Sequence, residues 1–129
     1  MTANICMGGV SHVIQLPDGV GMGAVTGQIN GAAYGRPIGD PVDLGDGKMS
    51  FESFHYFLDR DGSIILTKDK GIAKLDERSG LTLVEVEYTL EKATGRFEGY
   101  TGSWVGCGTM DSRSDTPKGA FRFEGNLSK

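Results

Sequence analysis

The sequence lacks any long hydrophobic run and any run of basic residues. Its 129 residues carry 13 lysines and arginines against 17 aspartates and glutamates, which gives a formal net charge of −4. No segment approaches the roughly 20 apolar residues that a membrane-spanning helix requires. Because nucleic acids and anionic membranes attract basic surfaces, we expect this chain to bind neither. The absences favour one small soluble domain covering residues 1–129.

Cysteine and histidine are also scarce, with two of each. The first residues lack the basic and apolar regions of a secretory signal, so we expect a cytoplasmic protein in which Cys6 and Cys107 are free thiols. His12 and His55 lie far apart in the sequence, and neither has a cysteine nearby. This spacing predicts no zinc or iron site, and we expect no cofactor.

Helical periodicity is absent from every window of a dozen residues, whereas glycine is abundant. There are 21 glycines, about twice the usual share of roughly 7%. They are spread along the chain, which is typical of many tight turns and bent strands rather than of a disordered segment.

Alternating apolar residues and turn signals predict seven or eight strands. The cleanest is 81–90, with Val84, Val86, Tyr88 and Leu90 on one face. Asp61-Gly62 predicts a hairpin turn, and 31–48, which contains Pro37 and Pro41, is expected to be a long loop with at most one short strand. The expected strands are 10–16, 20–29, 49–59, 63–67 with an extension at 71–75, 81–90, 96–105 and 120–127.

Strands joined by short turns, without helices between them, form an antiparallel meander. A long meander must protect its edges, and closure into a barrel does this best. The sequence therefore predicts an all-β, closed antiparallel barrel of about eight strands. An open two-sheet sandwich is the alternative.

A four-residue repeat late in the chain suggests two similar strands. Arg96-Phe97-Glu98-Gly99 recurs as Arg122-Phe123-Glu124-Gly125. In a half-buried strand the phenylalanine of each copy would face the core and its charged neighbours would face solvent. Chance recurrence of a short string is the other explanation.

The run 93–102, Ala-Thr-Gly-Arg-Phe-Glu-Gly-Tyr-Thr-Gly, resembles the Gly-Thr-Gly-x-Phe-x-Gly-Ala-x-Gly run of allene oxide cyclase-like and dirigent-like barrels. The likeness covers about the last fifty residues, and Ala93 and Tyr100 depart from it. It implies an eight-stranded, calycin-type barrel with an apolar cavity, usually a homo-oligomer, in a family that includes cofactor-free cyclases and non-catalytic dirigent relatives. No catalytic residue transfers, because the matched run is architectural, with Phe97 plugging the interior.

Two motif-like segments have simpler explanations. Residues 19–24 match a dinucleotide-binding glycine pattern, but no helix is expected after them to meet a pyrophosphate. Residues 59–63 resemble the start of a calcium loop, yet Ile64 and Lys70 stand where a glycine and a bidentate acid belong. We interpret the second segment as a hairpin turn.

The aromatic strand 49–59 holds the candidate catalytic residues Glu52, His55 and Tyr56. On a strand Glu52, Phe54 and Tyr56 share one face, and His55 lies on the other. One face should line the interior while the other packs on a neighbouring subunit, and the sequence does not say which. An acid or imidazole among aromatic rings loses solvation and becomes suited to proton transfer. A barrel mouth or interface with satisfied hydrogen bonds is the structural alternative.

The candidate substrate-binding residues are aromatic or polar side chains on predicted strands. His12 lies on the apolar face of 10–16, where a satisfied core histidine is the simpler interpretation. Tyr88 could offer its hydroxyl to a carbonyl, or only fill volume. The full set is His12, Phe54, Tyr88, Tyr100 and Trp104.

The leading hypothesis is a cofactor-independent isomerase, cyclase or proton-transfer lyase acting on a small apolar organic molecule inside the barrel, where proximity supplies much of the rate. The main alternative is a non-catalytic carrier of a hydrophobic metabolite, and a filled barrel serving as a scaffold is a third. A homo-oligomer, dimer or trimer, is expected in each case.

Overall fold

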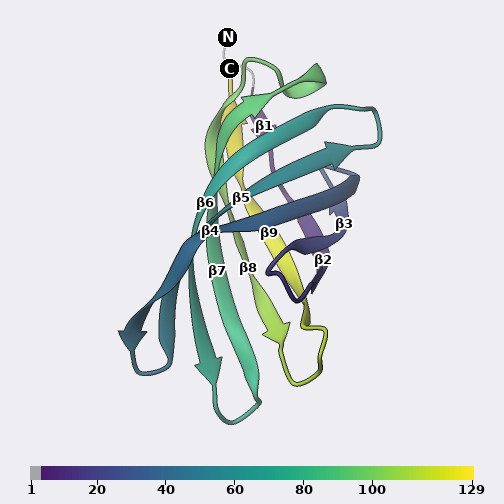
Figure 1. The fold of residues 1–129 in the computed structure, drawn as a ribbon. Helices are drawn as coiled ribbons and strands as arrows, with labels where there is room; N and C mark the ends of the chain where they lie inside the picture. The colour runs from purple at the N-terminus through teal and green to yellow at the C-terminus, as the bar shows by residue number, and fades with distance from the viewer. Residues whose placement is uncertain (1–3) are drawn as a thin grey trace.

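The computed structural model describes residues 4–129, which form one closed antiparallel β-barrel with an extra short strand (Figure 1). One 3-10 turn, η1 (Gly95–Phe97), interrupts the strands. The strands are β1 (Asn4–Cys6), β2 (Gly9–Gln15), β3 (Gly21–Gly27), β4 (Gly31–Gly45), β5 (Lys48–Asp59), β6 (Ile64–Asp76), β7 (Leu81–Ala93), β8 (Thr101–Asp111) and β9 (Lys118–Ser128).

Closure follows from the pairing of the last strand. β2 to β9 pair in sequence order, and β9 then pairs with both β8 and β2. β1 lies beside the end of β9, in line with β2. The predicted eight-stranded up-and-down barrel is confirmed, and the open sandwich is wrong because no edge is left between β9 and β2.

Side chains alternate between the interior and the outer surface, as the pleat of a strand requires. On β7, Val86 and Tyr88 are buried while Glu85 and Glu87 are exposed, as the sequence predicts. The Asp61-Gly62 turn joins β5 and β6, and Gly62 has the positive φ of 93° that such a turn favours. The 59–63 segment is therefore a hairpin turn, and the 19–24 glycines lead into β3 without a following helix.

The expectation of a loop at 31–48 is wrong, because β4 runs from Gly31 to Gly45. β3 pairs with β4 only up to Gly35, so the rest of β4 has a paired strand on one side only, β5. Proline cannot donate to a ladder but is tolerated on such an edge. Pro37 and Pro41 lie in this part, and the register with β5 is irregular between Ile38 and Val42. The two prolines thus lie in the part of β4 that is hydrogen-bonded to a neighbouring strand on one side only.

The expectation of a strand from Arg96 is also wrong for its first residues. Residues 95–97 form η1, and β8 begins only at Thr101, whereas the second copy of the repeat lies within β9. The two copies therefore have the same sequence but different secondary structure. Phe97 is fully buried, as expected of an interior plug.

The two ends of the barrel differ. Successive connections along the chain alternate between the two ends of the barrel. The loop 28–30, the 60–63 turn and η1 therefore share one end, here named the closed end, with the start of β1 and the end of β9 (Figure 1). The opposite end carries the turns at 16–20, 46–47, 77–80 and 112–117, and is named the open end.

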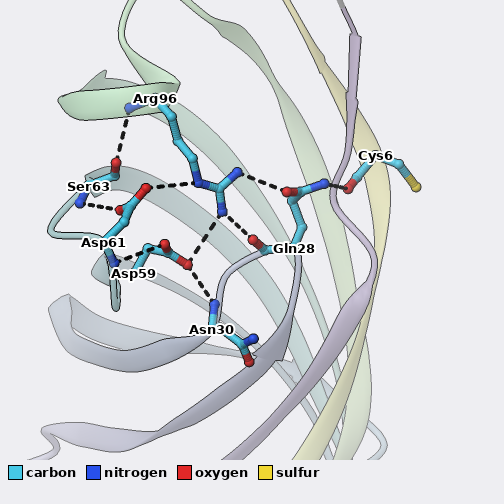
Figure 2. Close-up of polar contacts among 7 residues, drawn as sticks. All are labelled: Cys6, Gln28, Asn30, Asp59, Asp61, Ser63 and Arg96. Carbon is cyan, nitrogen blue, oxygen red and sulfur yellow. Dashed lines mark hydrogen bonds and ion pairs between the residues drawn. The ribbon is translucent and has the colours of Figure 1, made fainter.

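A polar network covers the closed end (Figure 2). The Arg96 guanidinium bonds the side chain and backbone carbonyl of Gln28, and it contacts Asp59 at 3.4 Å and Asp61 at 3.3 Å. The Arg96 backbone N–H donates to Ser63 Oγ at 3.0 Å. One side chain therefore ties together three loops that are far apart in the sequence.

Asp59 is the buried anchor of this network. Its Oδ1 accepts the backbone N–H of Asn30 at 2.8 Å, and its Oδ2 accepts that of Asp61 at 3.2 Å. These bonds, the one from Asn30 first, lower the pKa of Asp59 to about 2 against the opposing effect of burial. The carboxylate is thus held ionised by backbone amides and, to a smaller extent, by Arg96.

Among residues 4–129, no helix combines the length and the hydrophobicity needed to cross a bilayer.

Candidate functional site

A cavity of about 410 Å³ lies inside the barrel and reaches toward the open end. This volume is within the range of small-molecule sites, about 300–1,000 Å³. Inward-facing side chains of β2, β4, β5, β6, β7, β8 and β9 line it: Ser11, Val13, Ala33, Gly35, Phe51, Ser53, His55, Phe57, Ala73, Val84, Val86, Tyr88, Met110, Phe121 and Phe123.

The cavity exists because small residues occupy inward positions near the open end. Ala33, Gly35, Ser53 and Ala73 all contribute to its wall. At the closed end the same alternation places large side chains inside, and Trp104 and Phe97 are almost completely buried there. Most of the wall is aliphatic and aromatic, which suits an apolar guest. Polar side chains that also line the cavity include Gln15, Arg36, Thr82 and Ser112.

A histidine–aspartate pair stands in this wall. His55 on β5 contacts Asp69 on β6, with 2.5 Å between Nδ1 and Oδ2. The Asp69 side chain is 0% exposed and that of His55 is 22% exposed. An ionised carboxylate can only accept a hydrogen bond, so its partner Nδ1 is the donor. In the neutral form of the imidazole the lone pair is then at Nε2.

Asp69 is held in place by two further donors. Ser53 Oγ donates to its Oδ2 at 2.9 Å, and Thr67 Oγ1 donates to its Oδ1 at 2.6 Å. Both hydroxyls are buried. Because each carboxylate oxygen is bonded, Asp69 has little freedom to rotate, and it fixes the orientation of the imidazole.

The imidazole lies over Gly35, on the neighbouring strand β4. A Cβ atom at position 35 would stand 2.3 Å from His55 Nε2, so only glycine leaves room for the ring. Phe57 stacks on the imidazole at 5.6 Å between ring centroids. Within residues 4–129 no protein group bonds Nε2, and this nitrogen is free to bond a guest.

Tyr88 is another polar side chain at the cavity wall. Its ring meets that of His55 edge-on, at 5.3 Å between centroids. Burial and then the nearby charge of Asp69 raise the pKa of Tyr88 well above its usual range. The hydroxyl therefore stays protonated, and in the described part of the chain it has no hydrogen-bond partner.

Two of the three predicted catalytic residues lie outside the barrel. Glu52 and Tyr56 are exposed on the outer face of β5, together with half-buried Phe54, which meets Tyr56 edge-on at 5.9 Å. Glu52 pairs in register with Lys70 and borders an external hollow. Of the predicted catalytic set, only His55 points into the cavity.

The predicted binding residues are also divided. Tyr88 lines the cavity, whereas Trp104 packs in the core, stacked on Tyr88 at 5.4 Å. The Trp104 Nε1 is buried and has no hydrogen-bond partner among residues 4–129. Tyr100 is half-buried at the closed end, where the Lys129 ammonium lies 5.5 Å from its ring.

The placement of His12 on a core face is wrong. His12 is exposed on β2 with Val10 and Ile14, while Ser11 and Val13 face inward. On this strand, the more apolar of the two alternating sets of residues thus lies on the outer face of the barrel. On the inner face, Ser11 lines the cavity beside large aromatic residues of β9. Because these aromatic residues fill the interior next to β2, the inward side chains of β2 can be small.

Sequence reasoning missed Asp69, Ser53 and Gly35. A signal for Asp69 was available: Ile65, Thr67, Asp69 and Gly71 alternate along β6, and all four are buried. An aspartate on the inward register of a strand is costly unless it is bonded. The division of 63–75 into two pieces separated by a bulge hid this alternation.

The remaining sulfur and imidazole groups do not gather into a site. Cys6 and Cys107 are exposed free thiols. Burial, and then the charges of Glu85 and Glu124, raise the pKa of Cys107. No group of three or more histidines, cysteines or acids within residues 4–129 is placed to hold a metal ion.

Comparison with known proteins adds no relative. No family model, no curated protein and no solved structure matches the chain. Arguments about function therefore rest on the cavity and its side chains.

Proposed function

We propose that the protein catalyses proton transfer, as in an isomerisation, cyclisation or elimination, on a small and mostly apolar molecule bound in the barrel. The observation that carries the proposal is the His55–Asp69 pair, 2.5 Å apart, at the wall of an apolar cavity of about 410 Å³. No cofactor is required for such a reaction.

In this mechanism His55 is the base. Nε2 takes a proton from a carbon of the substrate, and the imidazolium that forms is stabilised by the Asp69 carboxylate at Nδ1. The same nitrogen returns the proton to another atom of the substrate. Phe57 and Tyr88 pack around the imidazole and hold its ring in place. Asp69 is a positioning residue, and Ser53 and Thr67 hold it.

A compound with one acidic C–H bond tests this proposal without knowledge of the natural substrate. 5-Nitrobenzisoxazole is small, apolar and aromatic, and it opens to a coloured cyanophenolate when a base removes its proton. We expect the protein to accelerate this opening, and His55→Gln to lower the rate about 10²- to 10⁴-fold, as loss of a positioned base does. The rate is measured by absorbance at constant pH.

His12→Gln is the matched control, because His12 is exposed on the outer face of β2. It should retain the wild-type rate. A wild-type rate no greater than that of free imidazole at the same concentration, or an equal loss in both variants, would reject the proposal.

The same cavity also suits a carrier of a hydrophobic metabolite. Its predominantly apolar wall favours this second function, for which His55 and Tyr88 would only orient the guest. Saturable binding of the probe without turnover would favour the carrier.

A further inference from the structure

We infer that the substrate of the proposed reaction is a carbonyl compound, whose oxygen accepts a hydrogen bond from Tyr88 while His55 moves the proton from the adjacent carbon. The inference rests on the proposed function. It adds a class of substrate and a second catalytic residue.

The cavity wall holds polar groups of two opposite kinds, an acceptor and a donor. Nε2 of His55 carries a lone pair, and the Tyr88 hydroxyl is a donor. Ser53, on the same face of β5 as His55, is already bonded to Asp69. The other polar side chains that line the cavity are Ser11, Gln15, Arg36, Thr82 and Ser112. An apolar guest that satisfies both free groups needs an acidic proton and one acceptor atom.

Tyr88 is confined to the role of hydrogen-bond donor. Burial and the neighbouring Asp69 charge keep its proton in place. Tyr88 lines the cavity, and its hydroxyl has no hydrogen-bond partner within residues 4–129, so it is suited to bonding a guest's acceptor. Its ring is fixed between Trp104, stacked at 5.4 Å, and the edges of His55 and Phe57.

Tyr88 and His55 are neighbours in the cavity wall. The rings of Tyr88 and His55 lie 5.3 Å apart, and Tyr88 is close enough to Asp69 to feel its charge. In a carbonyl compound the acidic proton is on the carbon next to the carbonyl carbon. A guest can therefore present its C–H to one side chain and its oxygen to the other.

The chemistry balances without a further reactant. The C–H bond breaks, its proton goes to His55 Nε2, and its electron pair forms the C=C bond of an enolate as the carbonyl π electrons move to oxygen. Tyr88 stabilises that oxygen by hydrogen bonding and keeps its own proton. Return of the proton to the distal carbon of an unsaturated enolate completes a shift of the double bond.

Cyclohex-3-en-1-one tests the inference, because moving its double bond gives cyclohex-2-en-1-one, which absorbs in the ultraviolet. We expect wild type to catalyse this conversion and Tyr88→Phe to slow it about 10²- to 10³-fold, the loss expected for one oxyanion donor. Opening of 5-nitrobenzisoxazole should fall far less in this variant, since the nitro group already stabilises the phenolate product.

Tyr34→Phe is the matched control, because Tyr34 lies on the outer face of β4, where its hydroxyl accepts a bond from Arg36 Nε at 2.6 Å. It should leave both rates unchanged. Circular dichroism and the unfolding midpoint establish that each variant is folded.

An infrared measurement separates contact with the substrate from a structural role. The carbonyl stretch of bound acetophenone should lie at lower frequency in wild type than in Tyr88→Phe, while His55→Gln should keep the wild-type frequency. Equal frequencies in wild type and Tyr88→Phe, or equal isomerisation rates, would overturn the inference and leave the proposed function standing. Failure of 5-nitrobenzisoxazole to react would overturn both.

Discussion

The two ends of the barrel use the same alternation of side chains for opposite purposes. At the closed end large residues fill the interior, with Phe97, Ile65 and Leu127 all fully buried. Toward the open end Gly35 and Ser53 take equivalent inward positions, and a cavity with a histidine–aspartate pair results. The strands follow the same alternation at both ends. The size of the inward-facing side chains therefore decides which end is packed and stabilises the barrel, and which end can bind a guest.

Phe97→Ala should produce the largest loss of stability and so break the closed end. Removing a fully buried aromatic side chain leaves a void, which typically costs about 3–5 kcal/mol. Equilibrium urea unfolding measures the change in the free energy of unfolding. Phe54→Ala, on the outer face, is the control and should cost much less. Equal losses in the two variants would mean that η1 does not seal the core.

Arg96→Gln should cost less, because it removes polar contacts rather than core volume. Loss of a charged group that bonds a buried partner costs about 1–3 kcal/mol, and the lower part of this range is expected because Arg96 is 36% exposed. Its match at the open end is Arg113→Gln. Arg113 lies closer to its own partner, Asp111, at 2.8 Å, but is 64% exposed.

The Arg113 pair should therefore contribute only about 0–1 kcal/mol, the usual value for exposed ion pairs. The same unfolding experiment compares the two variants. If Arg113→Gln were the more destabilising, distance rather than burial would govern these pairs, and the closed end would not be the more stable one.

The sequence predicted the barrel but only part of the site, for a physical reason. Alternation and turn residues are local features of a sequence. Strand β7, the Asp61-Gly62 turn and the closed barrel could therefore be predicted from them. Which face of a strand turns inward depends on neighbouring strands. This is why His12 was assigned to the wrong face and the choice between His55 and Tyr56 had to wait for the structure.

Contacts between residues on different strands are harder to predict from a single sequence. Gly35 and His55 are twenty positions apart, and only the register of β4 with β5 places one over the other. Asp69 meets His55 in the same way, through the pairing of β5 with β6. The likeness to allene oxide cyclase-like barrels, the homo-oligomer and the cytoplasmic location stay predictions.

Gly35→Ala should leave the barrel folded and still disable the binding end. The added Cβ would stand 2.3 Å from His55 Nε2, so the imidazole must rotate away and its bond to Asp69 is lost. The cost should lie below the about 1–3 kcal/mol typical of an overfilled core, because a side chain beside a cavity can move. Opening of 5-nitrobenzisoxazole should then fall toward the rate of His55→Gln, although His55 is still present.

Gly21→Ala is a close control for this variant. Gly21 pairs with Gly35 in the register of β3 with β4, and a Cβ there would meet no atom within 4 Å. It should keep the wild-type rate and the strongly deshielded proton NMR signal expected of the His55 Nδ1–H bonded to Asp69, a signal that Gly35→Ala should lose. Should Gly35→Ala keep both the rate and the signal, the base would not be an imidazole held by Asp69 over Gly35. The open end would then be a cavity without positioned chemistry, and the contrast between the two ends would reduce to packing alone.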